Sequence, residues 1–177
     1  MDTVKIEKKH TSDLSDEELM TIFKLLKEVN GEDFSVENLS NAFGGIHFLA
    51  YENKMLIGHV AVVQRSMLLD NKPHKVGYVE SLGVHPNYQH KGVAGSLVKE
   101  INLMIDKCYH FGALSPLNET KNLFEEAGWN EMMSPYYEYT LVGIVPSSIQ
   151  CVMTYSNRLA LDSKKKLVCD YRENNAW

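Results

Sequence analysis

Hydrophobic residues near the amino end of the chain recur at the spacing of a helix face. Leu19, Ile22, Phe23, Leu26 and Val29 follow one another at intervals of three and four. The preceding segment 15–18 (Ser-Asp-Glu-Glu) has the form of a capping box, and Asn-Gly at 30–31 is a typical helix end. The pattern predicts a helix over about 16–29. A looser pattern over 36–43, followed by two glycines, predicts a second short helix.

From Ile46 the pattern changes to one that is typical of strands. Residues 46–52 and 55–68 are rich in Val, Ile and aromatic side chains, and Asn53-Lys54 separates them as a turn. A second turn over 70–73 leads into a third strand over 75–84. These segments predict an antiparallel meander of three strands.

The second half of the chain alternates between helix and strand patterns. Apolar residues predict a long helix over about 92–107, followed by a strand over 109–115 that must run parallel to the strand before the helix. Residues 118–127 predict a short helix closed by Gly128, and alternation predicts strands over 136–142 and 149–155. The fold class is therefore α+β, with a mixed, mostly antiparallel central sheet flanked by helices. The length of 177 residues predicts a single domain over 1–177.

Composition and charge exclude several classes of function. The net charge of −5 gives no basic surface for nucleic acid or for a lipid headgroup. No apolar stretch is long enough to span a membrane, and the first ten residues lack the apolar segment of a signal peptide, so we expect a cytoplasmic protein. The three cysteines are widely spaced and the seven histidines are scattered, so we expect buried reduced thiols and no metal.

The segment between the third strand and the long helix carries the clearest chemistry. It reads Gln89, His90, Lys91, Gly92, Val93 and Ala94. The first amides of a helix have no intrahelical acceptor, and with the helix dipole they can bind phosphate oxygens. Gly92 and Ala94 let the backbone approach a diphosphate closely, and the two basic side chains can add charge. The alternative is that the small residues serve only to pack the start of the helix.

This segment resembles the acetyl-coenzyme A loop of the GCN5-related N-acetyltransferase superfamily, which reads Q/R-x-x-G-x-G/A between a strand and a long helix. The order of the predicted elements agrees. Further blocks are similar to one branch, the aminoglycoside 2′-N-acetyltransferases. These blocks lie at 43–47, 59–65, 77–80, 112–115, 128–129 and 169–172, with a tryptophan at 177.

The resemblance implies an acyl-CoA N-acyltransferase fold and transfer of an acetyl group from acetyl-CoA to a primary amine. Leu82 and Val84 match the strand positions whose backbone holds the pantetheine arm. The Leu82 N–H would then face the thioester oxygen, where one such donor contributes about 3 kcal/mol to the transition state. The residues implied in binding acetyl-CoA are Leu82, Val84, Gln89, His90, Lys91, Gly92, Val93, Ala94 and Asn118. Simple helix capping is the alternative for Asn118.

An ammonium group must lose its proton before it can attack, so the reaction calls for a carboxylate. Glu80 lies two residues before Leu82 and matches the family's glutamate. A surface residue paired with lysine is the alternative reading of Glu80, and the terminal carboxylate of Trp177 is the rival base. The position where many family members carry a tyrosine as general acid is Phe124 here, so we assign no general acid.

The same resemblance assigns substrate contacts to Asp33, Glu80, Ser115 and Trp177. Two acidic positions of the branch are Asn38 and Asn175 here, and fewer anions favour a less charged amine. The leading hypothesis is an aminoglycoside 2′-N-acetyltransferase that acts in antibiotic resistance. The alternatives are an acetyltransferase for another small amine or a peptide amino terminus, and a sensor that binds acyl-CoA without catalysis. The resemblance also makes a homodimer a possible assembly.

Overall fold

The computed structural model describes residues 4–133, 135–172 and 176–177. Contacts between Cα atoms divide the chain into two compact units. The amino-terminal unit consists of Met1–Val63 and Val79–Ile101, and the carboxyl-terminal unit consists of Gln64–Tyr78 and Asn102–Trp177. Strands β3 (Met55–Leu69) and β4 (Lys72–Val84) and helix α3 (Val93–Cys108) run from one unit into the other.

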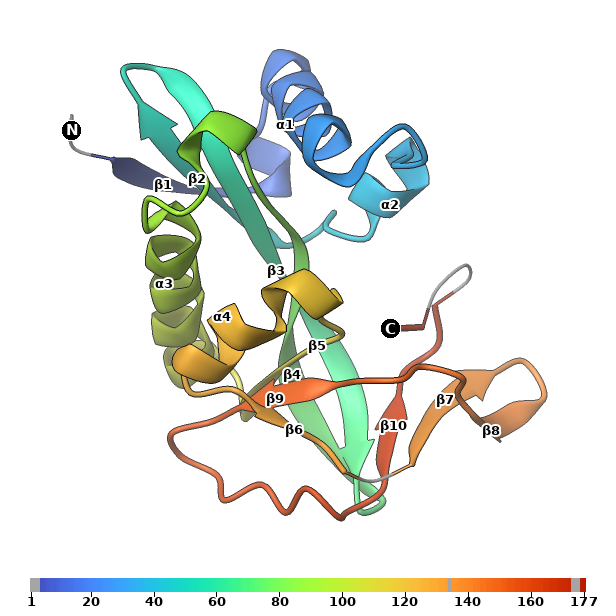
Figure 1. Ribbon diagram of the computed structural model, residues 1–177. Helices are drawn as coiled ribbons and strands as arrows, with labels where there is room; N and C mark the ends of the chain where they lie inside the picture. The colour runs from blue at the N-terminus through green and yellow to red at the C-terminus, as the bar shows by residue number, and fades with distance from the viewer. Residues whose placement is uncertain (1–3, 134, 173–175) are drawn as a thin grey trace. The chain divides into compact units, whose positions relative to one another are not determined.

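The amino-terminal unit is built on antiparallel strands. β1 (Lys5–His10) pairs with β2 (Ile46–Glu52), and β2 pairs with β3 (Figure 1). The β2–β3 hairpin turns at Asn53 and Lys54, which both have positive φ angles, as a type I′ turn requires. The predicted hairpin is confirmed. β1 was not predicted, because Ile6 is the one hydrophobic residue among its six and the segment has few of the β-branched and aromatic residues that mark a strand.

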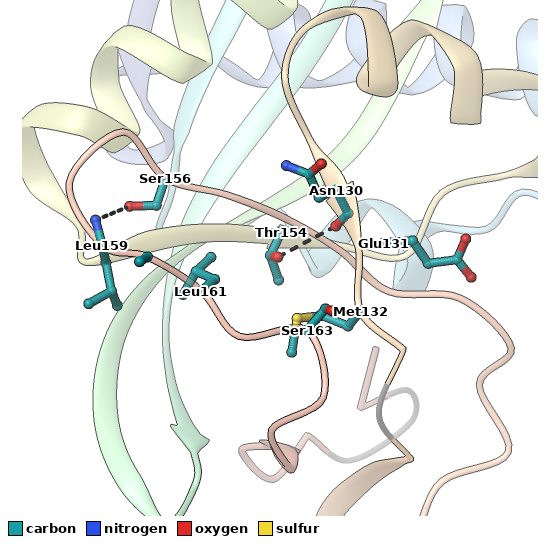
Figure 2. A pocket seen from close by; sticks show the side chains of 9 residues that line it. Asn130, Glu131, Met132, Thr154, Ser156, Leu159, Leu161 and Ser163 are labelled. Carbon is teal, nitrogen blue, oxygen red and sulfur yellow. Dashed lines mark hydrogen bonds between the residues drawn. The ribbon is translucent and has the colours of Figure 1, made fainter.

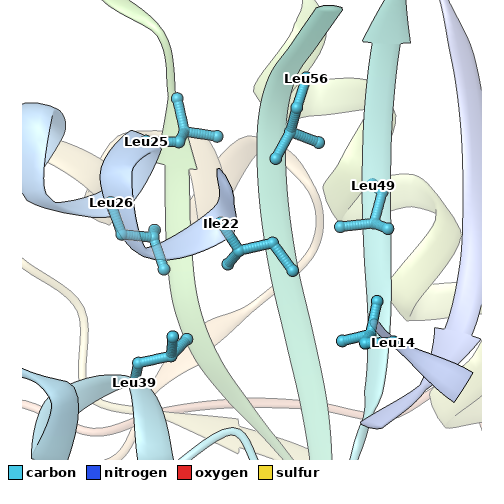
Figure 3. Packing of buried hydrophobic residues seen from close by; sticks show 7 residues of the cluster. All are labelled: Leu14, Ile22, Leu25, Leu26, Leu39, Leu49 and Leu56. Carbon is cyan, nitrogen blue, oxygen red and sulfur yellow. The ribbon is translucent and has the colours of Figure 1, made fainter. Parts of the chain in front are cut away.

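Two capped helices cover the hydrophobic core of this unit. α1 (Asp16–Asn30) begins with the predicted capping box between Ser15 and Glu18, and α2 (Val36–Ser40) begins with a second box between Ser35 and Asn38. Both predicted helices are confirmed, although α2 ends three residues earlier than expected. Figure 3 shows the buried cluster that the helices form with the strands: Leu14, Ile22, Leu25, Leu26, Leu39, Leu49 and Leu56.

The carboxyl-terminal unit contains the parallel pair that the sequence predicts. β5 (Phe111–Leu114) runs parallel to β4, with Val76 opposite Phe111. β9 (Met153–Tyr155) pairs antiparallel with β5, and β6 (Asn130–Glu131) pairs antiparallel with β9. The hydrogen-bonded order of the strands is β6-β9-β5-β4-β3-β10-β7-β8.

Short strands at the carboxyl end complete this unit. β10 (Leu167–Cys169) pairs antiparallel with β3 and parallel with β7 (Tyr136–Thr140). β7 turns back into β8 (Gly143–Pro146) as a hairpin. The prediction of one strand over 136–142 is therefore wrong at its end, because the chain turns at Leu141-Val142 although both side chains are apolar.

The helix expected over 118–127 is confirmed in two parts. A 3₁₀ turn, η3 (Asn118–Thr120), leads into α4 (Lys121–Glu126). Gly128 has a φ angle of +87°, the left-handed conformation that closes a helix. The fold class is α+β, with a mixed sheet flanked by helices, as predicted. None of the helices within the described residues is long and apolar enough to cross a membrane.

We predict that Leu26→Ala lowers the free energy of unfolding by about 2–5 kcal/mol, because it leaves a cavity at a fully buried position in the cluster of Figure 3. Chemical denaturation measures the change. Met20→Ala on the same helix is the matched control; Met20 is 54% exposed, and we expect a change within about 0.5 kcal/mol. Equal losses in the two variants would contradict this assignment of the core.

Candidate functional site

Strand β4 is irregular at Ser81, the residue between Glu80 and Leu82. Ser81 has a φ angle of +55°, which is uncommon for a residue with a side chain and breaks the regular alternation of the strand. Its carbonyl oxygen lies 2.8 Å from His59 Nδ1. Glu80 and Leu82 are both half-buried. The two residues predicted to act on the amine and on the thioester therefore flank a distorted peptide.

A short loop joins the end of β4 to the start of α3. The His85 N–H donates to the Ile57 carbonyl, and a 3₁₀ turn, η2 (Pro86–Tyr88), follows. The side-chain amide of Gln89 donates to the Val84 carbonyl at 3.1 Å. The side chain of Gln89 thus stabilises the conformation of the loop by bonding it to the end of the strand.

Two residues of the loop adopt the left-handed backbone conformation before the helix begins. His90 has a φ angle of +58° and Gly92 one of +84°. Among the described residues, apart from Gly92 and its two chain neighbours, no atom lies within 4 Å of the place where a Cβ on Gly92 would stand, so the backbone is accessible there. Val93, the first residue of α3, is buried and packs against Gly58 of β3. The first amides of a helix have no acceptor within the helix, and an accessible backbone at this place is a feature of anion-binding loops.

Beside this loop lies a hollow with a volume of about 360 Å³. The Lys91 ammonium is 5.2 Å from the centre of the Tyr88 ring and contributes a positive charge to the hollow. The remaining lining residues come from the same unit: Val4, Glu52, Met55, His85, Asn87 and Val93. The hollow thus contains the carboxylate of Glu52 and the ammonium of Lys91, and Lys91 is the lining residue that can attract an anion.

Asp33 lies in the connection between α1 and α2. It is exposed, and the next residue, Phe34, packs against the hydrophobic cluster. Asn38, which replaces an acidic residue of the aminoglycoside branch, accepts a hydrogen bond of 2.7 Å from the Ser35 N–H. The neutral side chain thus has a capping role here. Asn175, the other replacement, lies outside the described residues.

The remaining predicted site residues belong to the carboxyl-terminal unit. Ser115 is half-buried and directly follows β5, and Asn118 is exposed at the start of η3. Capping does not explain Asn118, because Leu117 and Thr120 occupy the N-cap positions of η3 and α4. Phe124 is buried and packs edge-to-face on Trp129, with ring centres 5.5 Å apart.

Trp177 is 6% exposed and packs against the Tyr136 ring, with centres 5.8 Å apart. The buried guanidinium of Arg65 holds the chain just before it. Arg65 donates to the carbonyls of Ala176 and Asp170 and forms an ion pair of 2.6 Å with the Asp170 carboxylate. These contacts fix the position of Trp177 within its unit.

Burial raises the pKa of the Cys169 thiol to about 12, so this thiol stays protonated and donates to the Ala176 carbonyl. All three cysteines carry free thiols, but the expectation of burial is wrong for Cys108, which is exposed, and Cys151 is half-buried. Within the described part of the chain, no three His, Cys, Asp or Glu side chains are grouped to hold a metal ion.

A second hollow, of about 440 Å³, lies in the carboxyl-terminal unit and is shown in Figure 2. It is lined mainly by uncharged side chains, and the Glu131 carboxylate on its rim is already paired with Lys121 at 2.5 Å. None of the predicted site residues lines it. We therefore place the candidate chemistry at β4 and the loop that follows it.

Comparison with known proteins agrees with this geometry. The model of the acetyltransferase (GNAT) family matches residues 16–129, which include β4, the loop and α3. The chain belongs to the GNAT family. An aminoglycoside 2′-N-acetyltransferase from Mycolicibacterium fortuitum is 27% identical over 174 residues, covering 95% of this chain and 89% of the relative.

Two solved structures illustrate the fold. The ribosomal-protein-S18-alanine N-acetyltransferase of Escherichia coli has a TM-score of 0.62 and 17% identity, with 89% of this chain and 96% of that chain covered. An acyl-CoA N-acyltransferase from Pseudomonas aeruginosa has a TM-score of 0.62 and 14% identity, with 87% and 100% covered. The fold is therefore the acyl-CoA N-acyltransferase fold, as the resemblance implied.

Members of the GNAT family use acetyl-CoA as co-substrate, and this chain is an acetyl-CoA-dependent N-acetyltransferase. The loop of this chain fits a diphosphate: Gly92 leaves the backbone open, and Lys91 supplies positive charge beside it.

Three residues with structural importance were not singled out from the sequence. His47, His59 and Arg65 all lie within blocks shared with the aminoglycoside branch, but none was given a role, and the two histidines were counted among scattered ones. In the register of β2 on β3, His47 lies opposite Ala61, two residues from His59, so the two imidazoles share one face. The predicted hairpin, with this register, would have indicated that His47 and His59 are neighbours. Arg65 gives no such local signal, because its partners are more than 100 residues away.

We predict that Arg65→Met lowers the free energy of unfolding by about 3 kcal/mol, because two carbonyls and a carboxylate lose a buried donor. Acrylamide should also quench the tryptophan fluorescence more strongly as Trp177 becomes accessible. Arg158→Met, at an exposed arginine of the same unit, is the matched control and should change neither quantity. Unchanged quenching in Arg65→Met would show that Arg65 does not hold Trp177.

Proposed function

We propose that this protein transfers the acetyl group of acetyl-CoA to the 2′-amine of an aminoglycoside. The observation that carries the proposal is the relative with this activity in its name, which aligns with 95% of the chain. Because the match covers 95% of the chain, it includes Glu80 and the loop at Gly92. A role in antibiotic resistance would follow from this substrate.

Acetyl-CoA would bind along the end of β4 and at the loop. In this proposal the amides of Gly92, Val93 and Ala94 bind the diphosphate, and Lys91 and His90 add charge. The buried side chains of Val84 and Val93 leave only their backbone groups for the cofactor, and Gln89 acts by bracing the loop. Asn118 would contact the pantetheine arm. The Leu82 N–H would donate to the thioester oxygen as negative charge develops there.

Glu80 would attract the substrate ammonium and accept its proton, directly or through a water molecule. The nitrogen then attacks the thioester carbon, the carbon–sulfur bond of the resulting tetrahedral intermediate breaks, and the thiolate of coenzyme A leaves. The second proton that the nitrogen loses passes to the thiolate or to water. The Trp177 carboxylate is the alternative base, and Asp33 and Ser115 would add substrate contacts. Phe124 has no proton to give, so in this proposal the thiolate leaves without help from that position.

The neutral Asn38 favours a second candidate substrate, a small amine with fewer positive charges. An aminoglycoside carries several ammonium groups, and each missing carboxylate weakens the attraction to such a polycation. Asn38 also belongs to the capping box of α2. Its neutral amide oxygen accepts the hydrogen bond from the Ser35 N–H, so this bond needs no carboxylate. A panel of amines of different charge separates the two candidates.

We predict that thiol release from acetyl-CoA depends on a 2′-amine in the acceptor, with turnover for tobramycin-like and not for 2′-hydroxyl compounds. Glu80→Gln should lower kcat/KM by about 100-fold or more, because general-base assistance contributes 10²–10⁴-fold, roughly, to such steps. Glu125→Gln, at an exposed carboxylate, is the matched control. Background rates with every aminoglycoside, tobramycin-like or kasugamycin-like, together with turnover of a simpler amine, would favour the second candidate.

We predict that Gly92→Glu weakens binding of acetyl-CoA by at least about tenfold, or about 1.4 kcal/mol, measured by calorimetry. The substitution places a side chain and a negative charge where the diphosphate would lie. Gly31→Glu is the matched control, since Gly31 also has a left-handed φ angle of +91° and open space around it. Equal affinities in the two variants would show that the diphosphate binds elsewhere.

A further inference from the structure

Two buried histidines connect the amino-terminal segment of the chain to the irregular peptide of β4. The Thr11 hydroxyl lies 2.9 Å from His47 Nε2, and His47 Nδ1 lies 2.9 Å from His59 Nε2. His59 Nδ1 lies 2.8 Å from the Ser81 carbonyl oxygen. Both imidazoles are fully buried. The four groups form one continuous row of hydrogen bonds within the amino-terminal unit.

The chemistry of these groups determines where each proton lies. A carbonyl can only accept, so His59 Nδ1 carries a hydrogen that it donates to Ser81. Burial lowers the pKa of His59 to about 3 and that of His47 to about 4, so both rings are neutral near pH 7. A neutral ring has one bare nitrogen, and His59 Nε2 therefore accepts from His47 Nδ1. His47 Nε2 accepts from the Thr11 hydroxyl in turn.

All donors in the row thus point toward Ser81. Hydrogen bonds arranged head to tail polarise one another, so each bond strengthens the next. The row also explains how a residue with a side chain is held at a φ angle of +55° in the middle of a strand. Such a conformation costs about 1–3 kcal/mol and persists only where the surroundings hold it.

The bond to Ser81 also determines the direction of the next amide. The Ser81 carbonyl and the Leu82 N–H belong to the same planar peptide group, and in a trans peptide they point in opposite directions. His59 holds the carbonyl on one side of the strand. The Leu82 N–H must therefore point to the other side, away from the buried imidazole.

We propose that His59, supported by His47 and Thr11, is a positioning residue that aims the Leu82 N–H at the thioester oxygen of acetyl-CoA. This inference rests on the proposed function, in which that N–H stabilises the developing negative charge. His59 touches neither substrate; it acts through the peptide it holds. A donor in a site of this kind must be in place before the reaction, because reorientation during the reaction would cost part of its contribution.

Two substitutions at His59 separate positioning from simple packing. His59→Leu fills the space but leaves the Ser81 carbonyl without its donor. His59→Asn places an amide N–H near the position of Nδ1 and can still donate to Ser81. We expect kcat to fall by at least about tenfold in His59→Leu and by less than about threefold in His59→Asn. Deleting an oxyanion donor outright lowers kcat by roughly 10²–10³-fold, and misdirecting the donor should cost only part of that. Binding of acetyl-CoA should stay within about threefold in both, because the loop at Gly92 is unchanged.

Ile105→Ala controls for lost stability, since Ile105 is a buried core residue of the carboxyl-terminal unit without a role at the site. Assays are made at a temperature where all variants are folded. If His59→Leu retains the kcat of Ile105→Ala, or if His59→Asn loses as much kcat as His59→Leu, the inference is overturned.

A readout without turnover keeps this test separate from that of the proposed function. Acetyl-CoA is titrated into ¹⁵N-labelled protein, and the amide proton of Leu82 is followed by nuclear magnetic resonance. We expect a downfield shift in the wild type and in His59→Asn, and a shift less than half as large in His59→Leu. If no amine is acetylated but this difference is observed, the proposed function fails and the positioning role stands. Equal shifts in all three proteins would overturn the positioning role.

Discussion

The hydrogen bond between His59 and the Ser81 carbonyl is the constraint on which the rest of the candidate site depends. It holds a residue of β4 in a conformation that a strand does not adopt by itself, and it lies between Glu80 and Leu82. A regular strand would pair this peptide with a neighbouring strand and place successive side chains on alternate faces. In the proposed function, this distortion turns the Leu82 N–H toward the thioester of acetyl-CoA.

The loop at the end of the same strand follows a related principle. There, glycine at position 92 supplies a left-handed turn, and Val93 anchors the first turn of α3 against Gly58. The backbone at Gly92 is exposed because this residue has no side chain and Val93 is buried in the core. In both places, buried side chains fix the direction of main-chain groups, and the main chain would contact the thioester carrier.

The features that could be predicted from the sequence are those set by local interactions. Three such features depend on a few consecutive residues each, and the structure contains all of them: the helix capping box at Ser15, the turn at Asn53-Lys54 and the loop at Gly92. β10 has only three residues and exists because β3 and β7 lie on either side of it, so its sequence alone carries no sufficient signal. The same holds for Arg65, whose partners follow more than 100 residues later. The role of His59 required the register of two strands and the conformation of a third.

The most direct test of the account is a crystal structure of the protein with acetyl-CoA. The account predicts that the diphosphate lies on the amides of Gly92 to Ala94 and that the thioester oxygen accepts a hydrogen bond from the Leu82 N–H, with His59 still bonded to Ser81. A diphosphate bound away from this loop, or a thioester oxygen turned away from Leu82, would contradict it.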